Sequence, residues 1–193
     1  PDNWEMFRLV DTKMNIGIVT GEYPPMKGGV GDYTRTLSLH LTASGHKVQV
    51  ITDQRCLHPK NYADEHEVIA NVSRRWSWLD LWRIRKTTSD LDILCIQYQA
   101  AAYGAMRPPI HFLPCITIPP TVTTFHDLEQ PYLFPKAGNL RRQAICQMAR
   151  YSDGVITTNS EDYHVCANEL QLPRLVEIPI GSNIPYNSTN TFS

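Results

Sequence analysis

Short apolar runs recur along the chain and are separated by segments with helical spacing. The runs at residues 15–20 and 93–96 are nearly continuous, and a glycine and a proline pair follow the first of them. Continuous apolar runs of this kind are typical of strands that are buried on both faces of a parallel sheet. The sequence therefore predicts strands at residues 15–20, 47–52, 67–71, 93–96, 121–125, 154–158 and 176–180.

Helix signals fall between these runs. The first predicted helix follows a glycine-rich loop and has Tyr33, Leu37 and Leu41 on one face. It ends at Gly45, a residue suited to the left-handed position after a helix. Ser77 followed by Asp80 predicts a helix start of the capping-box type, and Ser160 is expected to be the N-cap of another helix. A further helix is predicted over residues 139–151, with Ala144, Met148 and Tyr151 facing inward. Strands alternating with helices indicate a doubly wound, Rossmann-like α/β domain, with about seven parallel strands and helices on both faces.

The pattern also sets the expected domain limits. It begins at residue 14 and continues to residue 185, which we predict to be one Rossmann-like domain. Residues 1–13 have no clear period and are expected to be an extension. Residues 186–193 are polar and are expected to be a loose tail or a truncated linker between domains.

Composition narrows the functional classes. Of the 193 residues 42 % are hydrophobic, and no long uncharged apolar run is present, which argues against a disordered or a membrane-spanning chain. The net charge of -1 gives no support for a basic nucleic-acid surface. Five cysteines without C-x-x-C spacing favour reduced thiols in a cytoplasmic protein, and neither a zinc site nor another metal site is expected.

Ligands of such folds bind at the carboxyl ends of the strands, and the first loop there is rich in glycine. Gly28, Gly29 and Gly31 stand just before a predicted helix, where free backbone N–H groups attract an anion of phosphate size. A tight turn is the alternative explanation. The dinucleotide fingerprint fails because Thr34 stands where its third glycine belongs, and the phosphate-binding motif of Walker NTPases is absent.

Polar side chains follow three other predicted strands. His126 and Asp127 come directly after one strand, where an imidazole can hydrogen-bond a sugar hydroxyl or a phosphate. Gln97, Tyr98 and Gln99 end another strand, and Ser160 follows a third. Of these, Tyr98, Gln99 and Ser160, together with Asp127, are candidates for acceptor or sugar recognition. The alternatives stay open: His126 can be satisfied by neighbouring backbone, and Tyr98 and Gln99 can simply end a strand.

Taken in order, these segments resemble retaining glycosyltransferases of the GT-B fold, in glycosyltransferase family 4. The segment NIGIVTGEYPPMKGGVGDYTRTLSLHLTASGHKVQVIT is similar to the amino terminus of that family. The later segments DILCIQYQ, TVTTFHD, GVITTNSED and VEIPIGSNIP are similar in the same order. The similarity covers about residues 14–185.

The resemblance implies an amino-terminal, acceptor-side half of an enzyme with two Rossmann-like domains. Its partners would be a nucleotide-sugar donor, a hydroxyl acceptor and a carboxy-terminal domain that is missing here. Gly28 and Gly29 would lie by the donor phosphates, and His126 would act as the catalytic residue facing the transferred sugar. The leaving phosphate would take the acceptor's proton, so neither a metal nor a cofactor is expected. Family acceptors include lipids, which leaves peripheral membrane association open.

Three other functions remain open. A glycogen or sucrose synthase has a similar glycine-rich loop. A screen of nucleotide-sugar donors would distinguish such an enzyme from the glycosyltransferase described above. A non-catalytic module that binds a glycan or a partner fits a chain without a second domain. A dehydrogenase-like domain is the third alternative, for which nicotinamide binding is the test. As a fragment, residues 1–193 are expected to fold but not to transfer sugar.

Overall fold

The structure is a computed structural model that describes residues 12–57, 66–104, 108–128 and 138–181. Nearly all of the predicted extension at residues 1–13 lies outside these ranges, as does the predicted tail at residues 186–193. The predicted domain limits at both ends therefore stay predictions.

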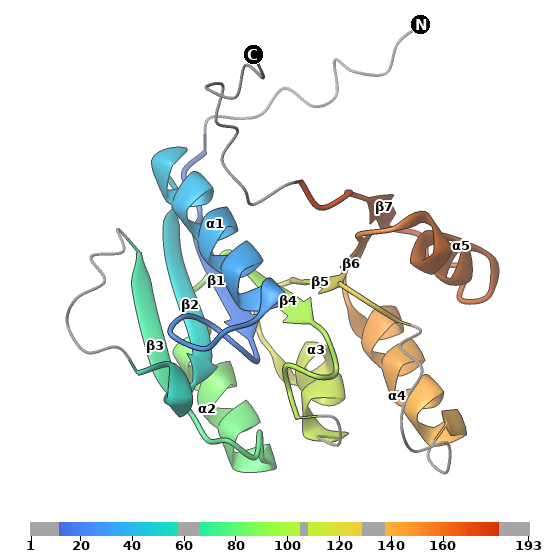
Figure 1. Cartoon of the computed structure of the whole chain (residues 1–193), viewed down its shortest axis with the longest axis horizontal. Coiled ribbons are helices and arrows are strands. Elements are labelled where there is room, and N and C mark those ends of the chain that lie inside the picture. The colour runs from blue at the N-terminus through green and yellow to red at the C-terminus, as the bar shows by residue number, and fades with distance from the viewer. Residues whose placement is uncertain (1–11, 58–65, 105–107, 129–137, 182–193) are drawn as a thin grey trace, which may run out of the picture.

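One seven-stranded sheet forms the centre of the molecule, in the order β3-β2-β1-β4-β5-β6-β7 (Figure 1). Every neighbouring pair is parallel, which confirms the predicted doubly wound sheet. The order turns back at β1, so that the chain builds the sheet first to one side and then to the other. The strands are β1 Asn15–Thr20, β2 Lys47–Asp53, β3 Glu67–Val72, β4 Ile93–Tyr98, β5 Thr121–Phe125, β6 Gly154–Thr157 and β7 Leu175–Glu177.

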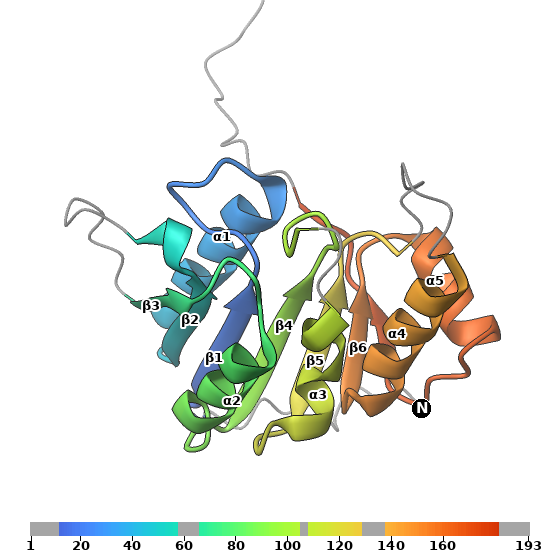
Figure 2. The ribbon, with the colours of Figure 1, turned by 90° about the horizontal axis from the view of Figure 1, so that it is seen from below.

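Helices cover both faces of the sheet. In Figure 2, α2, α3 and α4 stand in a row in front of the strands, while α1 and α5 lie behind them. This two-sided cover is expected when parallel strands are joined by right-handed crossovers. The helices are α1 Gly29–Ala43, η2 Gln54–Cys56, α2 Trp78–Thr87, η3 Pro108–Phe112, α3 Leu113–Ile116, α4 Gly138–Tyr151 and α5 Ser160–Asn168.

The core is divided by the sheet into two clusters. Ile16 and Ile18 of β1 pack toward α1, whereas Val19 joins the larger cluster on the face of α2, α3 and α4. Successive residues of a strand point to opposite faces, so a strand that is apolar throughout contributes to both clusters. This explains why β1 reads as a continuous apolar run.

Two local predictions about helices need correction. Asn159, not Ser160, is the N-cap of α5, because its side-chain oxygen accepts the backbone N–H of Asp162 at 2.8 Å. An asparagine in extended backbone is as good a cap as serine, and the chain reaches the helix one residue earlier. Tyr151 was expected to face inward, but its side chain is exposed at the end of α4. The last strand is also shorter than predicted and ends at Glu177.

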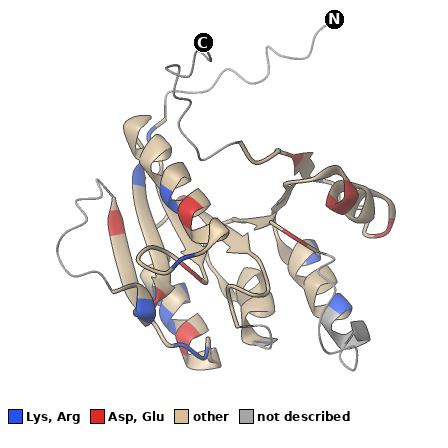
Figure 3. Cartoon of the chain, in the orientation of Figure 1, with Lys and Arg blue, Asp and Glu red and all other residues tan. Residues whose placement is uncertain are grey.

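Charged residues of both signs are spread over the molecule, and basic residues gather on α2 and in the turn before it (Figure 3). All five cysteines are free thiols. Among the helices of the described ranges, none is long and apolar enough to cross a bilayer.

Candidate functional site

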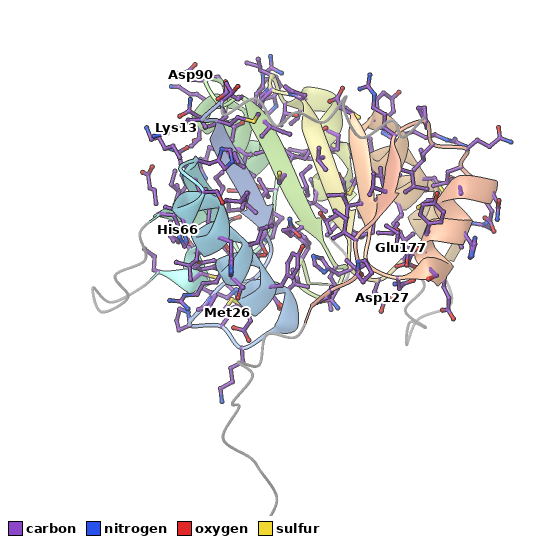
Figure 4. All side chains as sticks on the ribbon, turned by 90° about the horizontal axis from the view of Figure 1, so that it is seen from above. Lys13, Met26, His66, Asp90, Asp127 and Glu177 are labelled. Atoms are coloured by element: carbon purple, nitrogen blue, oxygen red, sulfur yellow. The ribbon has the colours of Figure 1, made fainter. Side chains whose placement is uncertain are left out.

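The carboxyl ends of β4 and β5 bring His126 against Gln97. Register pairs Gln97 with Thr124 and Tyr98 with Phe125, so the residue after β5 arrives beside the end of β4. The backbone N–H of His126 donates to the carbonyl of Tyr98 at 3.0 Å, which extends the ladder by one bond. The ring Nε2 lies 2.8 Å from Oε1 of Gln97, whose side chain is buried. Figure 4 shows the neighbouring Asp127 at this edge of the sheet.

The environment of His126 favours a neutral imidazole. Burial lowers the pKa of His126 from its usual 6.5 to about 4. Because the amide oxygen of Gln97 can only accept, Nε2 carries the ring proton, and Nδ1 of the neutral ring is left as an acceptor. Such a ring can accept a hydrogen bond from a hydroxyl group.

Tyr33 joins this group from the first turns of α1. Its ring meets the ring of His126 edge to face, with 4.9 Å between centroids. Burial, with a smaller effect of nearby Cys95, raises the pKa of the Tyr33 phenol. The contact joins the loop after β5 to α1, so the candidate imidazole is held between two segments that are remote in sequence.

The amino terminus of α1 is occupied by a carboxylate of the same chain. Oε1 of Glu22 accepts the backbone N–H groups of Val30 at 3.1 Å and Gly31 at 3.3 Å. Gly28 is the N-cap residue and has no side chain to cap with. A carboxylate at this position is stabilised by the free N–H groups and by the positive end of the helix. In this structure the N–H groups of Val30 and Gly31 donate to Glu22, and phosphate binding by the loop stays a prediction.

Gly28 and Gly29 differ in what surrounds them. A Cβ at Gly28 would lie 2.1 Å from Oε1 of Glu22, whereas a Cβ at Gly29 would meet nothing within 4 Å. Gly28 has extended backbone with φ -179°, which any residue can adopt. Glycine at residue 28 thus leaves room for the Glu22 carboxylate, and an added Cβ would displace the far end of that side chain without straining the backbone.

Of the other candidates, Tyr98, Gln99 and Ser160 have hydrogen-bond partners away from the ring of His126. Tyr98 is buried, and its hydroxyl group lies 2.7 Å from Nε2 of His111 in the core. The carbonyl of half-buried Gln99 accepts the N–H of Ala102 in a turn. Exposed Ser160 donates its hydroxyl to Oε1 of Glu177 at 2.9 Å. Half-buried Asp127 lies next to His126 in sequence and at the same edge.

Sequence reasoning did not find the roles of Glu22, Tyr33 and Gln97. Gln97 was noticed as part of a strand end. Side chains alternate between the two faces along β4, so the side chain of Gln97 meets His126 and that of Tyr98 does not. Glu22 carries a weak signal, because it is an acid in a glycine-rich loop that precedes an uncapped helix. Tyr33 was interpreted as part of an apolar helical face.

The end of β2 bears on the dehydrogenase alternative. Dinucleotide-binding domains use an acidic residue at about this place for the ribose hydroxyls. Here Asp53 is buried and accepts hydrogen bonds from the backbone N–H, Nε and Nη2 of Arg55 at 2.8 to 3.0 Å. Its carboxylate is committed to the arginine that follows it.

No other feature of the described residues competes with the strand ends. They contain no group of three or more His, Cys, Asp or Glu side chains placed to hold a metal ion. A hollow of about 790 Å³ lies between α4 and α5, apart from the strand ends. It is open and lined by helix side chains, so we prefer the carboxyl edge as the site. Its lining residues are Arg142, Gln143, Cys146, Gln147, Arg150, Tyr151, Glu169 and Leu170.

The open parallel sheet, with its polar side chains at the carboxyl edge, places the chain in the doubly wound α/β class. Within that class the chain belongs to glycosyltransferase family 4, because the model of that family, described as Glycosyltransferase Family 4, matches residues 27–183. The match includes Gly28, Gly29 and His126. A comparison with curated protein sequences finds no match.

Solved structures of GT-B glycosyltransferases share the fold. Sucrose-phosphate synthase from Thermosynechococcus elongatus superposes with a TM-score of 0.64 at 16 % identity, over 89 % of this chain and 49 % of that one. An alpha-glucosyltransferase in complex with UDP and a 13-mer DNA gives 0.53 at 16 % identity, over 86 % of this chain and 42 % of that one. The chain thus spans about half the length of these enzymes.

Proposed function

We propose that this chain is the amino-terminal, acceptor-side domain of a retaining glycosyltransferase that uses a nucleotide-sugar donor. The observation that carries the proposal is the half-buried ring of His126, held against Gln97 at the carboxyl edge of the sheet, in a chain of glycosyltransferase family 4. A glycogen or sucrose synthase, the alternative enzyme, would also be a nucleotide-sugar-dependent glycosyltransferase of the GT-B fold. The sucrose-phosphate synthase likeness at 16 % identity supports the fold alone.

In this proposal His126 contacts the transferred sugar. Gln97 fixes the proton on Nε2, so Nδ1 accepts a hydrogen bond from a sugar hydroxyl without carrying charge. Tyr33 and the backbone bond to Tyr98 hold the ring in one orientation. Catalysis then rests on positioning the donor and acceptor and on stabilising the leaving phosphate, whose oxygen takes the acceptor's proton.

The donor phosphates would approach the α1 amino terminus beside Gly28 and Gly29. Glu22 holds that position, so an incoming phosphate has to displace its carboxylate or bind alongside it. Cationic side chains for a diphosphate would come from a carboxy-terminal domain. We therefore expect residues 1–193 alone to bind nucleotide-sugars weakly, with Kd near millimolar, about -4 kcal/mol, and to transfer no sugar.

A second candidate function is a non-catalytic module that binds a glycan or a partner. The occupied helix terminus favours it, because Glu22 leaves two N–H groups committed within the chain. We expect no nucleic-acid acceptor, since the net charge is -1. The DNA belongs to the alpha-glucosyltransferase complex, and that likeness shows only the fold. The free cysteines fit the proposed cytoplasmic location.

Donor turnover separates the two functions. The protein expressed from its natural reading frame is incubated with a panel of nucleotide-sugars and candidate acceptors, and nucleotide release and product are measured. We expect release to depend on an acceptor, with the product keeping the anomeric configuration of the donor. Glycan binding without release of nucleotide from any donor would favour the binding module. Calorimetry on residues 1–193 tests whether most of the donor-binding groups belong to a carboxy-terminal domain. Micromolar donor affinity of this chain would contradict that.

A further inference from the structure

The loop after β5 that carries His126 is attached to the start of α5 as well as to β4. Register pairs Phe125 with Thr157, so the residues that follow β5 and β6 leave the sheet side by side. The backbone N–H of Leu128 donates to Oδ2 of Asp162 at 3.2 Å, although the two residues are 34 positions apart in sequence. The junction between β6 and α5 is therefore the second neighbour of the candidate site, on the side opposite β4.

The carboxylate of Asp162 has an unusual environment for the first turn of a helix. An acidic side chain at such a place normally lies at the surface and interacts with the helix dipole, as exposed Glu161 does. Asp162 is only 3 % exposed, and a buried carboxylate is costly unless hydrogen bonds satisfy it. Its Oδ2 accepts from Nδ2 of Asn159 at 2.9 Å as well as from Leu128. The carboxylate thus contacts both the helix cap and a loop that is remote in sequence.

Two backbone hydrogen bonds hold the loop on either side of its candidate residues. The N–H of His126 donates to the carbonyl of Tyr98 at 3.0 Å, and two residues later the N–H of Leu128 donates to Asp162. Thr158 adds a longer contact, with its hydroxyl oxygen 3.5 Å from the carbonyl oxygen of His126. Because both ends of this short stretch are fixed, its backbone angles and the direction of the imidazole are restricted.

Asp80 shows what the same residue does when it acts only within its own segment. It stands three residues after the N-cap of α2, as Asp162 does in α5, and it is also buried. Its carboxylate accepts from the backbone N–H groups of Ser73 and Ser77 and pairs with Arg83 at 3.2 Å. Each of these partners lies within seven positions of Asp80 in sequence. Asp162 differs in that one of its hydrogen bonds reaches the candidate site.

We propose that Asp162 is a positioning residue that orients the imidazole of His126 through the backbone of Leu128. Asp162 fixes the loop from the side of α5, while Gln97 fixes the ring from the side of β4. Catalysis is sensitive to displacements of about 1 Å, so a ring held from one side only is misplaced for the reaction. The catalytic consequence rests on the proposed contact of His126 with the transferred sugar, whereas the orientation of the ring can be measured without a substrate.

NMR hydrogen exchange in residues 1–193 tests the orientation. In the wild type the Leu128 amide should exchange at least about a hundredfold more slowly than in an unfolded chain. In Asp162→Ala we expect the Leu128 amide and the Nε2 proton of His126 to exchange at least about tenfold faster than in the wild type. Asp162→Asn keeps an oxygen that can accept the Leu128 N–H, so both rates should stay within about threefold of the wild type.

Asp80→Ala is the matched control, because it removes the same side chain from the same position of another helix. It should leave the exchange of the Leu128 amide and of the His126 ring unchanged. A second control is Glu161→Ala, which removes an exposed acid from the first turn of α5 without touching the loop. Circular dichroism checks that every variant is folded, and the wild-type and Asp162→Asn measurements stand even where Asp162→Ala does not fold.

Sugar transfer tests whether the orientation matters for catalysis. In the protein expressed from its natural reading frame, Asp162→Ala should lower kcat about 10- to 100-fold and change KM for the donor by less than about threefold. Asp162→Asn should keep at least about a third of the wild-type kcat, since it can still hold the loop. Asp80→Ala should keep the wild-type kcat.

Several results would overturn the proposal. They are an unprotected Leu128 amide in the wild type, exchange of the His126 ring that is equal in Asp162→Ala and wild type, and a kcat that is unchanged in Asp162→Ala. An equal fall of kcat in Asp80→Ala would also overturn it, because the effect would then be the general cost of a lost cap. Absence of transfer by the wild type would contradict the proposed function, and the exchange rates alone would then decide whether Asp162 orients His126.

Discussion

The start of α2 and the carboxyl edge of the sheet satisfy their polar groups in opposite ways. At α2, Ser77 and Asp80 cap one another within four residues. At the edge, Glu22 reaches the N–H groups of α1 from the preceding loop, and His126 is paired with Gln97, which lies 29 residues away in sequence. The first network needs only its own segment, whereas the second exists only once the sheet has formed.

The difference separates structural from functional polar groups. The capping box closes α2 regardless of what surrounds it, and it leaves no hydrogen-bonding capacity for a ligand. The pair at the sheet edge leaves Nδ1 of His126 as an acceptor in a half-buried position. A site assembled by tertiary contacts can place such a group at the meeting point of several strands, which local capping cannot do.

The pH dependence of stability gives the largest expected effect. Because burial holds the pKa of folded His126 near 4 while the unfolded value is about 6.5, the unfolded chain binds more protons between these limits. The free energy of unfolding should therefore fall by up to about 3 kcal/mol as pH drops from about 6.5 to about 4. Urea unfolding of wild type and His126→Gln across this range isolates the contribution.

NMR titration of His126 sharpens the same prediction. We expect a midpoint near 4 in the wild type and a neutral ring protonated at Nε2. In Gln97→Glu a carboxylate replaces the amide, and the midpoint should rise because it stabilises the imidazolium. A wild-type midpoint at or above 6.5 would contradict a neutral, half-buried ring.

The capping network of α2 gives the next effect. Burial raises the pKa of Asp80, but hydrogen bonds from Ser73 and Ser77 outweigh it and lower the value to about 2. Asp80→Asn should cost about 2 kcal/mol of unfolding free energy at pH 7. A depressed pKa stabilises the fold above the unfolded value, so this cost should disappear as pH falls from about 4 toward 2. Exposed Asp32→Asn in the first turn of α1 is the control and should cost about 0.5 kcal/mol.

The two glycines of α1 give the smallest and most selective effect. Gly28→Ala pushes a methyl group into the Glu22 carboxylate and should cost about 1 kcal/mol. Gly29→Ala enters open space and should change stability by less than about 0.5 kcal/mol. Chemical denaturation of both variants compares them. Equal costs at the two positions would show that Glu22 is not held at the helix terminus.

A double-mutant cycle tests whether the cost at residue 28 acts through Glu22. In a Glu22→Ala background the clash is gone, so Gly28→Ala should keep only the loss of a good N-cap residue. A coupling energy near zero would contradict the proposed contact between Gly28 and Glu22.

Most of the fold could be predicted from the sequence because its signals are local. Strands such as β1 and β4 are buried on both faces and read as continuous apolar runs, and the Ser77–Asp80 pair marks the start of α2. The errors concern boundaries and faces. Asn159 and Ser160 are both good caps, and nothing local decides between them. Tyr151 sits in the last turn of α4, where periodicity no longer determines the side that is buried.

The site could be predicted only in part. The positions of His126 and Gly28 followed from the rule that loops after parallel strands gather at one edge. The partners of these residues did not, because the register between β4 and β5 determines that Gln97 and not Tyr98 meets His126. The position of Glu22 depends on the path of a loop, which no periodic pattern describes.

Sugar transfer by the His126→Ala variant tests the central claim most directly. The protein is expressed from its natural reading frame, and kcat/KM is measured with the donor that the wild type turns over. The account predicts a loss of about 10- to 1000-fold, the size found when one transition-state hydrogen bond is removed, with the circular dichroism spectrum unchanged. An unchanged kcat/KM would contradict the account and make His126 a structural residue.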